Sequence, residues 1–235
     1  MYLNTHSYYS LRYGTYSIEK LIEQAVAWGV KTMVLTDINN SSGTLDFVRL
    51  AKEAGIKPVA GMEFRDGDKL LFIGVARNNH GFMELNDYMS SVNLKEKEFP
   101  KEELDDVCLE FTEVEIIYPY GFAPARKLHD HEHIGVKPVQ TNLLIRENPR
   151  LLERMVILQP VTFADNTTWY CHKNLRAIDH NLLLSHLKPE MYASSDEVFL
   201  PPQILEKAFE AYPQLIENTR LLLARCSFEF EFEGN

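Results

Sequence analysis

The sequence is poor in cysteine and lacks several features that would assign it to a familiar class. Its three cysteines, Cys108, Cys171 and Cys226, lie far apart and form no CxxC pair. That argues against a disulfide framework and a zinc ribbon, and it indicates a reducing compartment. No apolar run approaches the roughly 18 residues needed to cross a bilayer. The start, MYLNTHSYYS, has neither the basic nor the apolar part of a signal peptide. We therefore expect a cytoplasmic protein without a membrane segment.

Basic charge is also scarce. The 235 residues include 24 Lys and Arg against 34 Asp and Glu, a formal net charge of −10. Such a chain should repel phosphate backbones, so we expect no direct binding of nucleic acid. No GxGxxG follows the first predicted strand, which leaves a dinucleotide-binding fold unsupported. The remaining composition, 45% hydrophobic and 25% charged, is sufficient for the core of one large domain or two small ones.

A repeated unit of helix, glycine and short apolar strand indicates the fold class. Residues 17–28 have helical periodicity with Ser17 as the N-cap, Gly29 ends the helix, and residues 30–35 read as a buried strand. The unit returns twice, at residues 45–60 and 134–142. Repeats of this kind predict parallel strands joined by helices, and thus an α/β fold built as a closed or nearly closed βα barrel.

Further elements follow from the same periodicities. Strands are expected at residues 70–76, 107–111, 115–117 and 228–233. Helices are expected at residues 81–92, at 148–158, and as a pair broken at Pro213 within 201–225. Residues 93–103 should form an exposed connection and residues 160–200 an irregular polar stretch. We therefore predict a distorted seven-stranded βα barrel with a helical C-terminal extension. Residues 1–146 would form the barrel core and residues 147–235 the remainder.

Polar side chains stand at the ends of three predicted strands. The ends read Asn4-Thr5-His6, Thr36-Asp37-Ile38 and Gly61-Met62-Glu63. In a barrel, the C-terminal strand ends meet on one face, where sites are built. Histidine, aspartate and glutamate ligate metals, so His6, Asp37 and Glu63 are candidate ligands. The set is incomplete, because Asn4 and Ile38 stand where a metal cluster would require histidine.

Five stretches, spread from residue 2 to about residue 232, carry a family likeness. They are LNTHSYYSLRYGTYSIEKLIEQA, VLTDINNSSGTLDFVRLAKEAGIKPVAGMEF, VARNNHGFMELNDYMS, KPVQTNLLI and AYPQLIENTRLLLARCSFEF. In this order they resemble the polymerase and histidinol phosphatase (PHP) domain at the N-terminus of bacterial DNA polymerase III alpha subunits. The ending N-T-x-x-x-A-x-x-C is typical of the polymerase rather than of stand-alone phosphatases.

The resemblance implies that active members hold divalent ions which activate water at the barrel mouth. Of the family's ligands this chain keeps His6, Asp37 and Glu63. The positions of the lost ligands carry Asn4, Tyr13, Ile38, Leu71, Leu143 and Ile145. Because an alkyl group has no lone pair, we predict a vestigial site with no cofactor, or at most one weakly bound Zn or Mn ion.

The three surviving groups could instead be satisfied by hydrogen bonds. Asp37 would cap a following turn, His6 would bond a backbone carbonyl, and Glu63 would bond Tyr13 or Arg12. The aromatic side chains near the mouth, Tyr8, Tyr9 and Tyr13, would fill the space left by missing ligands.

Functionally, the resemblance implies the PHP domain of a DNA polymerase III alpha subunit with a structural and docking role in DNA replication or error-prone repair synthesis. The family's catalytic aspartates lie in a palm domain beyond residue 235, so this segment alone is expected to be inactive. Expected partners are the rest of the polymerase chain and a proofreading exonuclease subunit. Two alternatives stay open. One is a residual metal-dependent phosphoesterase or 3′–5′ exonuclease that uses His6, Asp37 and Glu63. The other is a ligand-binding barrel with Asn4 and Glu63 in its pocket.

Other clusters carry weaker signals. His129 and His133 could chelate a metal from one helical face, but a solvated helix end before Gly135 is the favoured interpretation. No motif places a Ser or Cys beside the scattered histidines His172, His180 and His186, which disfavours a nucleophilic triad. The acidic residues of 102–106 and those at Glu229, Glu231 and Glu233 read as exposed faces.

Overall fold

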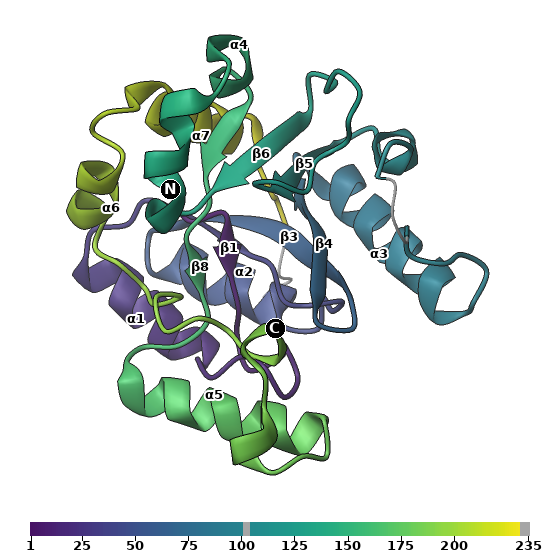
Figure 1. The fold of residues 1–235 in the computed structure, drawn as a ribbon, viewed down its shortest axis with the longest axis vertical. Coiled ribbons are helices and arrows are strands. Elements are labelled where there is room, and N and C mark those ends of the chain that lie inside the picture. The colour runs from purple at the N-terminus through teal and green to yellow at the C-terminus, as the bar shows by residue number, and fades with distance from the viewer. Residues whose placement is uncertain (101–103, 231–235) are drawn as a thin grey trace.

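The computed structural model describes residues 1–100 and 104–230, which form an α/β fold around a curled sheet (Figure 1). The strands are β1 Asn4–Thr5, β2 Thr32–Leu35, β3 Lys57–Asp66, β4 Lys69–Ala76, β5 Val114–Pro119, β6 Glu132–Val136, β7 Met155–Ile157 and β8 Pro160–Val161. The α-helices are α1 Ile18–Ala27, α2 Thr44–Glu53, α3 Asn79–Asn93, α4 Pro149–Leu152, α5 Asn166–Asp179, α6 Pro202–Ala208 and α7 Pro213–Arg225. Short 3₁₀ helices span Val107–Glu110, Pro138–Arg146, Leu184–His186 and Pro189–Met191.

The sheet curls because its two ends are brought together. Six strands are paired in the order β2-β3-β4-β5-β6-β7, and β1 pairs with β8 in a parallel ladder. Backbone bonds from Val34 N to Tyr2 O (3.1 Å) and from Thr36 N to Thr5 O (2.9 Å) join β1 to β2. Only two residues separate β7 from β8. The sheet thus extends beyond residue 146. The predicted boundary between a barrel core at residues 1–146 and a remainder at residues 147–235 stays a prediction.

The prediction of an α/β fold with a barrel-like sheet is confirmed, but the seven-stranded form does not match in detail. The described residues contain eight strands, and β4 runs antiparallel to both β3 and β5. Register pairs Asp66 with Lys69, which leaves Gly67 and Asp68 as a two-residue loop. Gly67 has a φ of +58°, as tight hairpin turns require. A hairpin of this kind forces the second strand to reverse direction.

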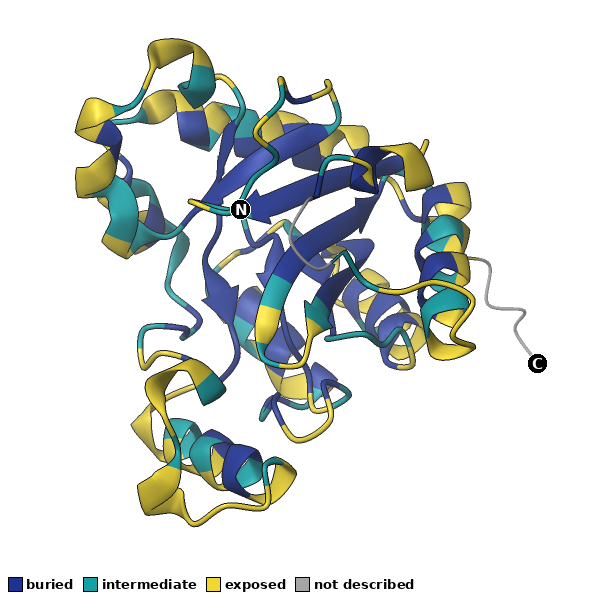
Figure 2. Cartoon of the chain, turned by 45° about the vertical axis from the view of Figure 1, so that its right-hand side comes forward, coloured by how far each residue is buried: buried dark blue, intermediate teal, exposed yellow. Residues whose placement is uncertain are grey.

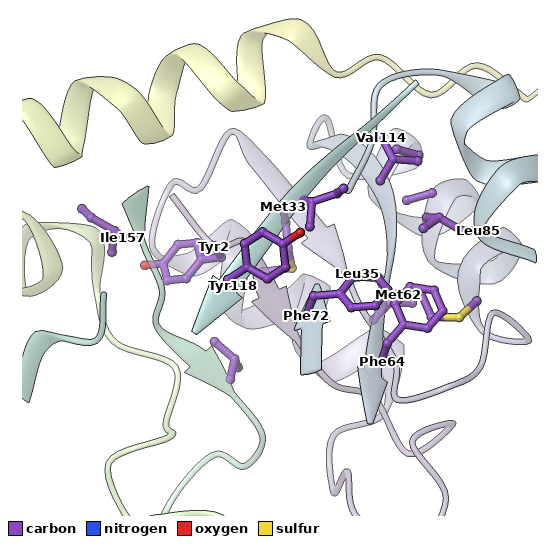
Figure 3. Packing of buried hydrophobic residues seen from close by; sticks show 14 of the residues in the cluster. Tyr2, Met33, Leu35, Met62, Phe64, Phe72, Leu85, Val114, Tyr118 and Ile157 are labelled. Atoms are coloured by element: carbon purple, nitrogen blue, oxygen red, sulfur yellow. The ribbon is translucent and has the colours of Figure 1, made fainter. Parts of the chain in front are cut away.

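Buried apolar residues form two layers, one inside the curl and one outside. The outer layer lies between the sheet and the helices, where Phe64 stacks on Phe72 with ring centroids 4.5 Å apart (Figure 3). The inner layer is built from the strands, with members Leu3, Val34, Val59, Ile73, Val75, Ile117, Val156 and Leu158. The strands are buried on both faces, and the helices expose their outer faces (Figure 2). A curled sheet covered by helices has this burial pattern.

The end of α7 closes one edge of the inner layer. Leu222, Leu223 and Cys226 pack into it. Lys57, the first residue of β3, donates from Nζ to the backbone oxygen of Leu223 (3.2 Å). The C-terminal helix therefore covers the edge where the parallel strands begin. The predicted site lies at the opposite edge, where α5 packs (Figure 1).

Several local predictions are confirmed. Ser17 caps α1 by accepting a hydrogen bond from Lys20 N, and α6 and α7 form the expected pair that is broken before Pro213. Gly29 and Gly55 end α1 and α2 with φ values of +67° and +73°. These positive values require glycine at the two helix ends, so the first two copies of the repeated unit are confirmed. The third copy, at residues 134–142, is wrong, because Gly135 lies inside β6 rather than after a helix and residues 138–146 form a 3₁₀ helix.

Other local predictions are wrong. Residues 107–111 form a 3₁₀ turn with Val107 and Cys108 buried, although their composition suits a strand. Within 148–158 the helix is a single turn, α4, followed by β7. The irregular stretch 160–200 contains α5, whose N-cap is Asp165. Residues 226–230 are not a strand. The rest of that predicted strand, and Glu102 and Glu103, lie outside the described residues.

Candidate functional site

The strand ends bring together three of the four polar residues expected at the barrel mouth. His6 follows β1 and Glu63 lies in the last part of β3, and neither side chain has any exposed surface. His6 Nε2 lies 3.0 Å from Glu63 Oε2. Asn4 donates from Nδ2 to the same oxygen at 2.5 Å. The convergence predicted for His6, Glu63 and Asn4 is therefore present, and its members bond one another.

Asp37 is buried nearby but has a separate set of partners. Its Oδ1 accepts hydrogen bonds from Ser7 N (2.7 Å) and Ser10 Oγ (2.6 Å), and its Oδ2 accepts one from Ser7 Oγ (2.7 Å). Burial raises the pKa of the Asp37 carboxyl, against the opposing effect of these bonds. The prediction that Asp37 caps a following turn is wrong in direction, because the turn it holds, at residues 7–10, precedes it.

Arg65 supplies the charge partner of Glu63, and the sequence analysis missed it. Its Nε donates to Glu63 Oε1, and its guanidinium carbon lies 4.4 Å from the ring centroid of Tyr13. Burial alone would raise the pKa of the Glu63 carboxyl, but Arg65 and His6 hold it well below its usual range. The partners predicted for Glu63, Tyr13 or Arg12, are therefore wrong. Arg12 lies outside this set and bonds Asp179.

A chain of hydrogen bonds continues from His6 to the other side of the mouth. His6 Nδ1 lies 3.1 Å from Thr162 Oγ1, which donates to Glu197 Oε2 (3.1 Å). Lys137 Nζ donates to Glu197 Oε1 at 2.8 Å. His6 thus bonds a hydroxyl rather than the backbone carbonyl that was expected. Burial would lower the pKa of Lys137, but the carboxylate of Glu197 raises it, so the lysine is held as a cation.

Apolar packing covers part of the mouth. Ile38, which stands where the family has a histidine, packs with Tyr13 and Phe163 in a small cluster. Tyr13 also meets His172 edge-on, with ring centroids 4.6 Å apart. The expectation that Tyr13 fills space left by a missing ligand agrees with this packing. Tyr8, in contrast, is 44% exposed.

Three other positions assigned to lost ligands do not face the mouth. Leu143 and Ile145 lie on the 3₁₀ helix Pro138–Arg146 and are 50% and 79% exposed. Leu71 is buried in the outer layer, and its neighbour Leu70 lines a cavity at the mouth. The cavity has a volume of about 500 Å³ and is lined by Tyr13, Arg65, Leu70, Lys137, Trp169, Tyr192 and Glu197, among others.

The histidine-rich segment is not helical, which overturns that part of its interpretation. His129–His131 form a turn, and His133 lies in β6, where its Nε2 is 2.7 Å from Glu115 Oε2. Among the described residues, one group of three potential ligands lies within 4.8 Å of one another: Cys108, His129 and Glu132. Arg126 already occupies it, with bonds to both carboxylate oxygens of Glu132 and a 3.1 Å contact to Cys108 Sγ.

Two of the three histidines scattered through residues 160–200, His172 and His180, have structural partners. His172 accepts at Nε2 from Ala193 N (2.8 Å) and donates from Nδ1 to Tyr13 O (2.7 Å). His180 lies 3.2 Å from Asp68, and His186 is exposed. Both ring nitrogens of His172 are therefore engaged with the backbone, and neither activates a Ser or Cys nucleophile.

This chain has a curled α/β sheet, with a buried histidine and buried carboxylates at the C-terminal ends of its strands. These features place it in the class of barrel-like proteins whose site lies at the barrel mouth. Residues 3–119 match the model of the PHP domain. The alpha subunit of DNA polymerase III from Halalkalibacterium halodurans is 24% identical over 260 residues, covering 97% of this chain and 23% of that protein. The error-prone DNA polymerase of Symbiobacterium thermophilum is 23% identical over 274 residues, covering 96% of this chain and 25% of that protein.

The chain therefore carries a PHP domain and is homologous along nearly its whole length to DNA polymerase III alpha subunits, as its motifs predicted. It spans about a quarter of the length of these relatives. A solved structure titled as a putative metal-dependent phosphoesterase from Bifidobacterium adolescentis covers 88% of this chain and 94% of its own, at 13% identity and a TM-score of 0.34. Within the described residues, no helix is long and apolar enough to span a membrane.

The side chains at the mouth do not fit a divalent metal. Both oxygens of Glu63 accept hydrogen bonds from protein groups, and so do both oxygens of Asp37. Thr162 Oγ1 donates to Glu197 and lies 3.1 Å from His6 Nδ1. His6 Nε2 faces Glu63, so both ring nitrogens of His6 are engaged with protein groups. Metal ligation would have to displace these bonds.

Among the residues that the sequence analysis missed, Arg65 could have been recognised from its spacing. It lies two positions after Glu63 on β3, and residues two apart in a strand share a face. Lys137 directly follows β6, and residues at the C-terminal ends of barrel strands lie at the mouth. Thr162 and Glu197 follow no motif or periodicity that would have identified them.

Proposed function

We propose that this chain is the PHP region of a DNA polymerase III alpha subunit, where it acts as a structural and docking element rather than as a phosphoesterase. One observation carries the structural role. Glu63, a ligand that the family pattern retains, is buried and is bonded to Asn4, His6 and Arg65. A carboxylate with three protein partners contributes to packing and charge balance, and it offers little to an ion.

The polymerase assignment is supported by the length and order of the match. The alpha subunits of Halalkalibacterium halodurans and Neisseria meningitidis align with 97% and 99% of this chain. A role in DNA replication or error-prone repair synthesis, a cytoplasmic location, and contact with the remainder of a polymerase chain follow from this assignment. A proofreading exonuclease is the docking partner we propose. The net charge of −10 gives no support for direct contact with nucleic acid.

A hydrolysis assay tests the structural role. The purified chain is incubated with Mn²⁺ or Zn²⁺ and either p-nitrophenyl phosphate or a 3′-recessed DNA duplex. The matched control is the double variant His6→Ala, Glu63→Ala. We expect both proteins to give the same background rate. Metal-dependent turnover that is present in the wild type and absent in the double variant would contradict the structural role.

A residual phosphoesterase is the second candidate function. It is motivated by His6 and Glu63, which are the residues that the family has at two of its metal-ligand positions. His6 Nε2 lies 3.0 Å from Glu63 Oε2. One ion, Zn²⁺ or Mn²⁺, would require His6 and Glu63 to give up their mutual bond, with Asp37 also released from the turn at residues 7–10. Elemental analysis of the protein purified without chelators measures this directly, and about one equivalent of metal would favour the enzyme.

A ligand-binding barrel is the third candidate, and the cavity of about 500 Å³ at the mouth motivates it. Its lining includes Arg65, Lys137 and three aromatic side chains, but neither Asn4 nor Glu63, the two residues expected in such a pocket. A thermal-shift screen of small carboxylates and phosphates measures this possibility. A shift that is lost in a Tyr192→Ala variant would favour it over the structural role.

A further inference from the structure

Two of the three buried carboxylates at the barrel mouth, Glu63 and Glu197, are matched by basic side chains from the chain itself, whereas Asp37 is held by Ser7 and Ser10. Glu63 has no exposed surface and pairs with Arg65, and Glu197 is 6% exposed and pairs with Lys137. Burying an ionised carboxylate is costly unless an opposite charge and hydrogen bonds compensate it. The two pairs supply that compensation without any ion.

The guanidinium of Arg65 is held in place from two sides. Its Nε donates to Glu63 Oε1, and its flat face rests on the ring of Tyr13, 4.4 Å from the centroid. The side chain is 12% exposed. Tyr13 is in turn fixed by His172, which bonds the backbone oxygen of Tyr13 at 2.7 Å. A cation–π contact and a charge-assisted hydrogen bond restrict the planar guanidinium in a way that a flexible lysine would not be restricted.

The pairs also join distant parts of the chain. The bonds run in one series through Arg65, Glu63, His6, Thr162, Glu197 and Lys137. Segment 193–198 is held at the mouth by the bonds of Glu197 in this series. It is also held by Gln159, whose Nε2 donates to the backbone oxygens of Asp196 (2.9 Å) and Val198 (3.0 Å). The series thus links the region matched by the PHP model to residues beyond it.

We propose that Arg65 takes the charge-neutralising place of a divalent ion at this mouth, and that its guanidinium keeps such ions out. A second cation beside Glu63 would be repelled by Arg65, and it would have to displace the existing bond between His6 Nε2 and Glu63. Removing the guanidinium frees Glu63 Oε1 and removes that repulsion, so His6 Nε2 and Glu63 can ligate one Zn²⁺. This inference rests on the contacts of the mouth and is independent of the polymerase assignment.

The test compares Zn²⁺ binding by the wild type, Arg65→Ala, and Arg65→Ala combined with His6→Ala. Competition with a chromogenic chelator gives affinity and stoichiometry, and the double variant subtracts Zn²⁺ held by other histidines and cysteines. We expect Arg65→Ala to bind one equivalent that the other two proteins lack, with an affinity at least roughly 100-fold above the wild type. Arg12→Ala, which removes an exposed arginine paired with Asp179, should behave as the wild type.

Urea denaturation with and without Zn²⁺ provides the second readout. Zn²⁺ should raise the unfolding midpoint of Arg65→Ala and leave that of the wild type unchanged. If Arg65→Ala does not fold, Arg65→Met retains the length of the side chain without its charge and takes its place. The inference is overturned if a folded variant without the guanidinium gains no His6-dependent Zn²⁺. It is equally overturned if the wild type already binds one equivalent through His6 and Glu63.

Discussion

The buried histidine of α5 gives the protein an acid-sensitive link. His172 has no exposed surface, donates from Nδ1 to Tyr13 O, and accepts at Nε2 from Ala193 N. Burial lowers the pKa of His172 to about 4, with Arg176 acting in the same direction and Glu197 in the opposite one. A protonated ring would present an N–H to the Ala193 N–H, so the neutral form is the one that fits.

The sign and size of the effect follow from linkage. The pKa of His172 is about 4 in the folded protein, and the ordinary value of 6.5 applies in the unfolded chain. Between these values the unfolded chain binds more protons, so the free energy of unfolding falls as the pH falls. The whole difference corresponds to roughly 3 kcal/mol, of which about 2 kcal/mol is lost between pH 7.5 and pH 5. The contribution is fully present above the unfolded pKa.

Urea unfolding at pH 7.5 and pH 5, followed by tryptophan fluorescence, measures this loss in the wild type and in His172→Gln. Glutamine retains one donor and one acceptor without titrating. We expect the wild type to lose about 2 kcal/mol more than the variant. His186→Gln, which alters an exposed histidine, should behave as the wild type. Other titrating groups are common to all three proteins and cancel in the difference. Equal losses in the wild type and His172→Gln, within about 0.5 kcal/mol, would refute the reasoning.

Three further predictions concern stability, measured by urea unfolding at neutral pH. Leu222→Ala should cost about 2–5 kcal/mol because it opens a cavity in the inner layer, and Leu221→Ala, at a 48% exposed position, should cost within about 0.5 kcal/mol. Similar losses from both would show that α7 does not close the inner layer. Asp37→Asn should lower the free energy of unfolding by about 1–3 kcal/mol, because the asparagine NH₂ group would face hydrogen-bond donors of the turn at residues 7–10. A neutral effect would mean that the turn does not depend on the carboxylate. Gly61→Ala should cost about 1–3 kcal/mol, because the new Cβ would lie 2.7 Å from a backbone oxygen of β4. A stable variant would disprove that close approach.

The repeated units were predictable because local chemistry determines them. Gly29 and Gly55 have positive φ angles that other residues avoid, and each follows a helix with one buried face. The reversal of β4 was predictable too, because Gly67-Asp68, with glycine at the first loop position, is a hairpin signal between two apolar runs. That signal was passed over because the surrounding repeat favoured parallel strands.

Elements whose state depends on distant contacts could not be read in the same way. Residues 107–111 have the composition of a strand, yet Val107, Cys108 and Phe111 are buried from a 3₁₀ turn. Burial there depends on contacts with the outer core layer, which no local pattern encodes. Helix α5 was missed because, of its 14 residues, just His172, Arg176 and Ala177 are buried. Two of those three are polar, so the apolar periodicity that marks a helix is weak.

The same distinction explains what could be inferred about the site. The loss of ligands is a property of single residues, and an isoleucine at position 38 cannot donate a lone pair wherever it lies. What replaces a lost ligand is a property of the assembled fold. Glu63 meets Arg65 through the two-residue period of its own strand. Its link to Lys137 runs through His6, Thr162 and Glu197, which come from distant parts of the chain. Once a buried carboxylate loses its metal, the fold must compensate its charge, because an uncompensated charge there would cost several kcal/mol. Arg65 does so for Glu63, and hydrogen bonds from Ser7 and Ser10 do so for Asp37. A sequence with vanished ligands and retained carboxylates therefore predicts that compensating basic residues or hydrogen-bond donors exist, and the fold identifies them.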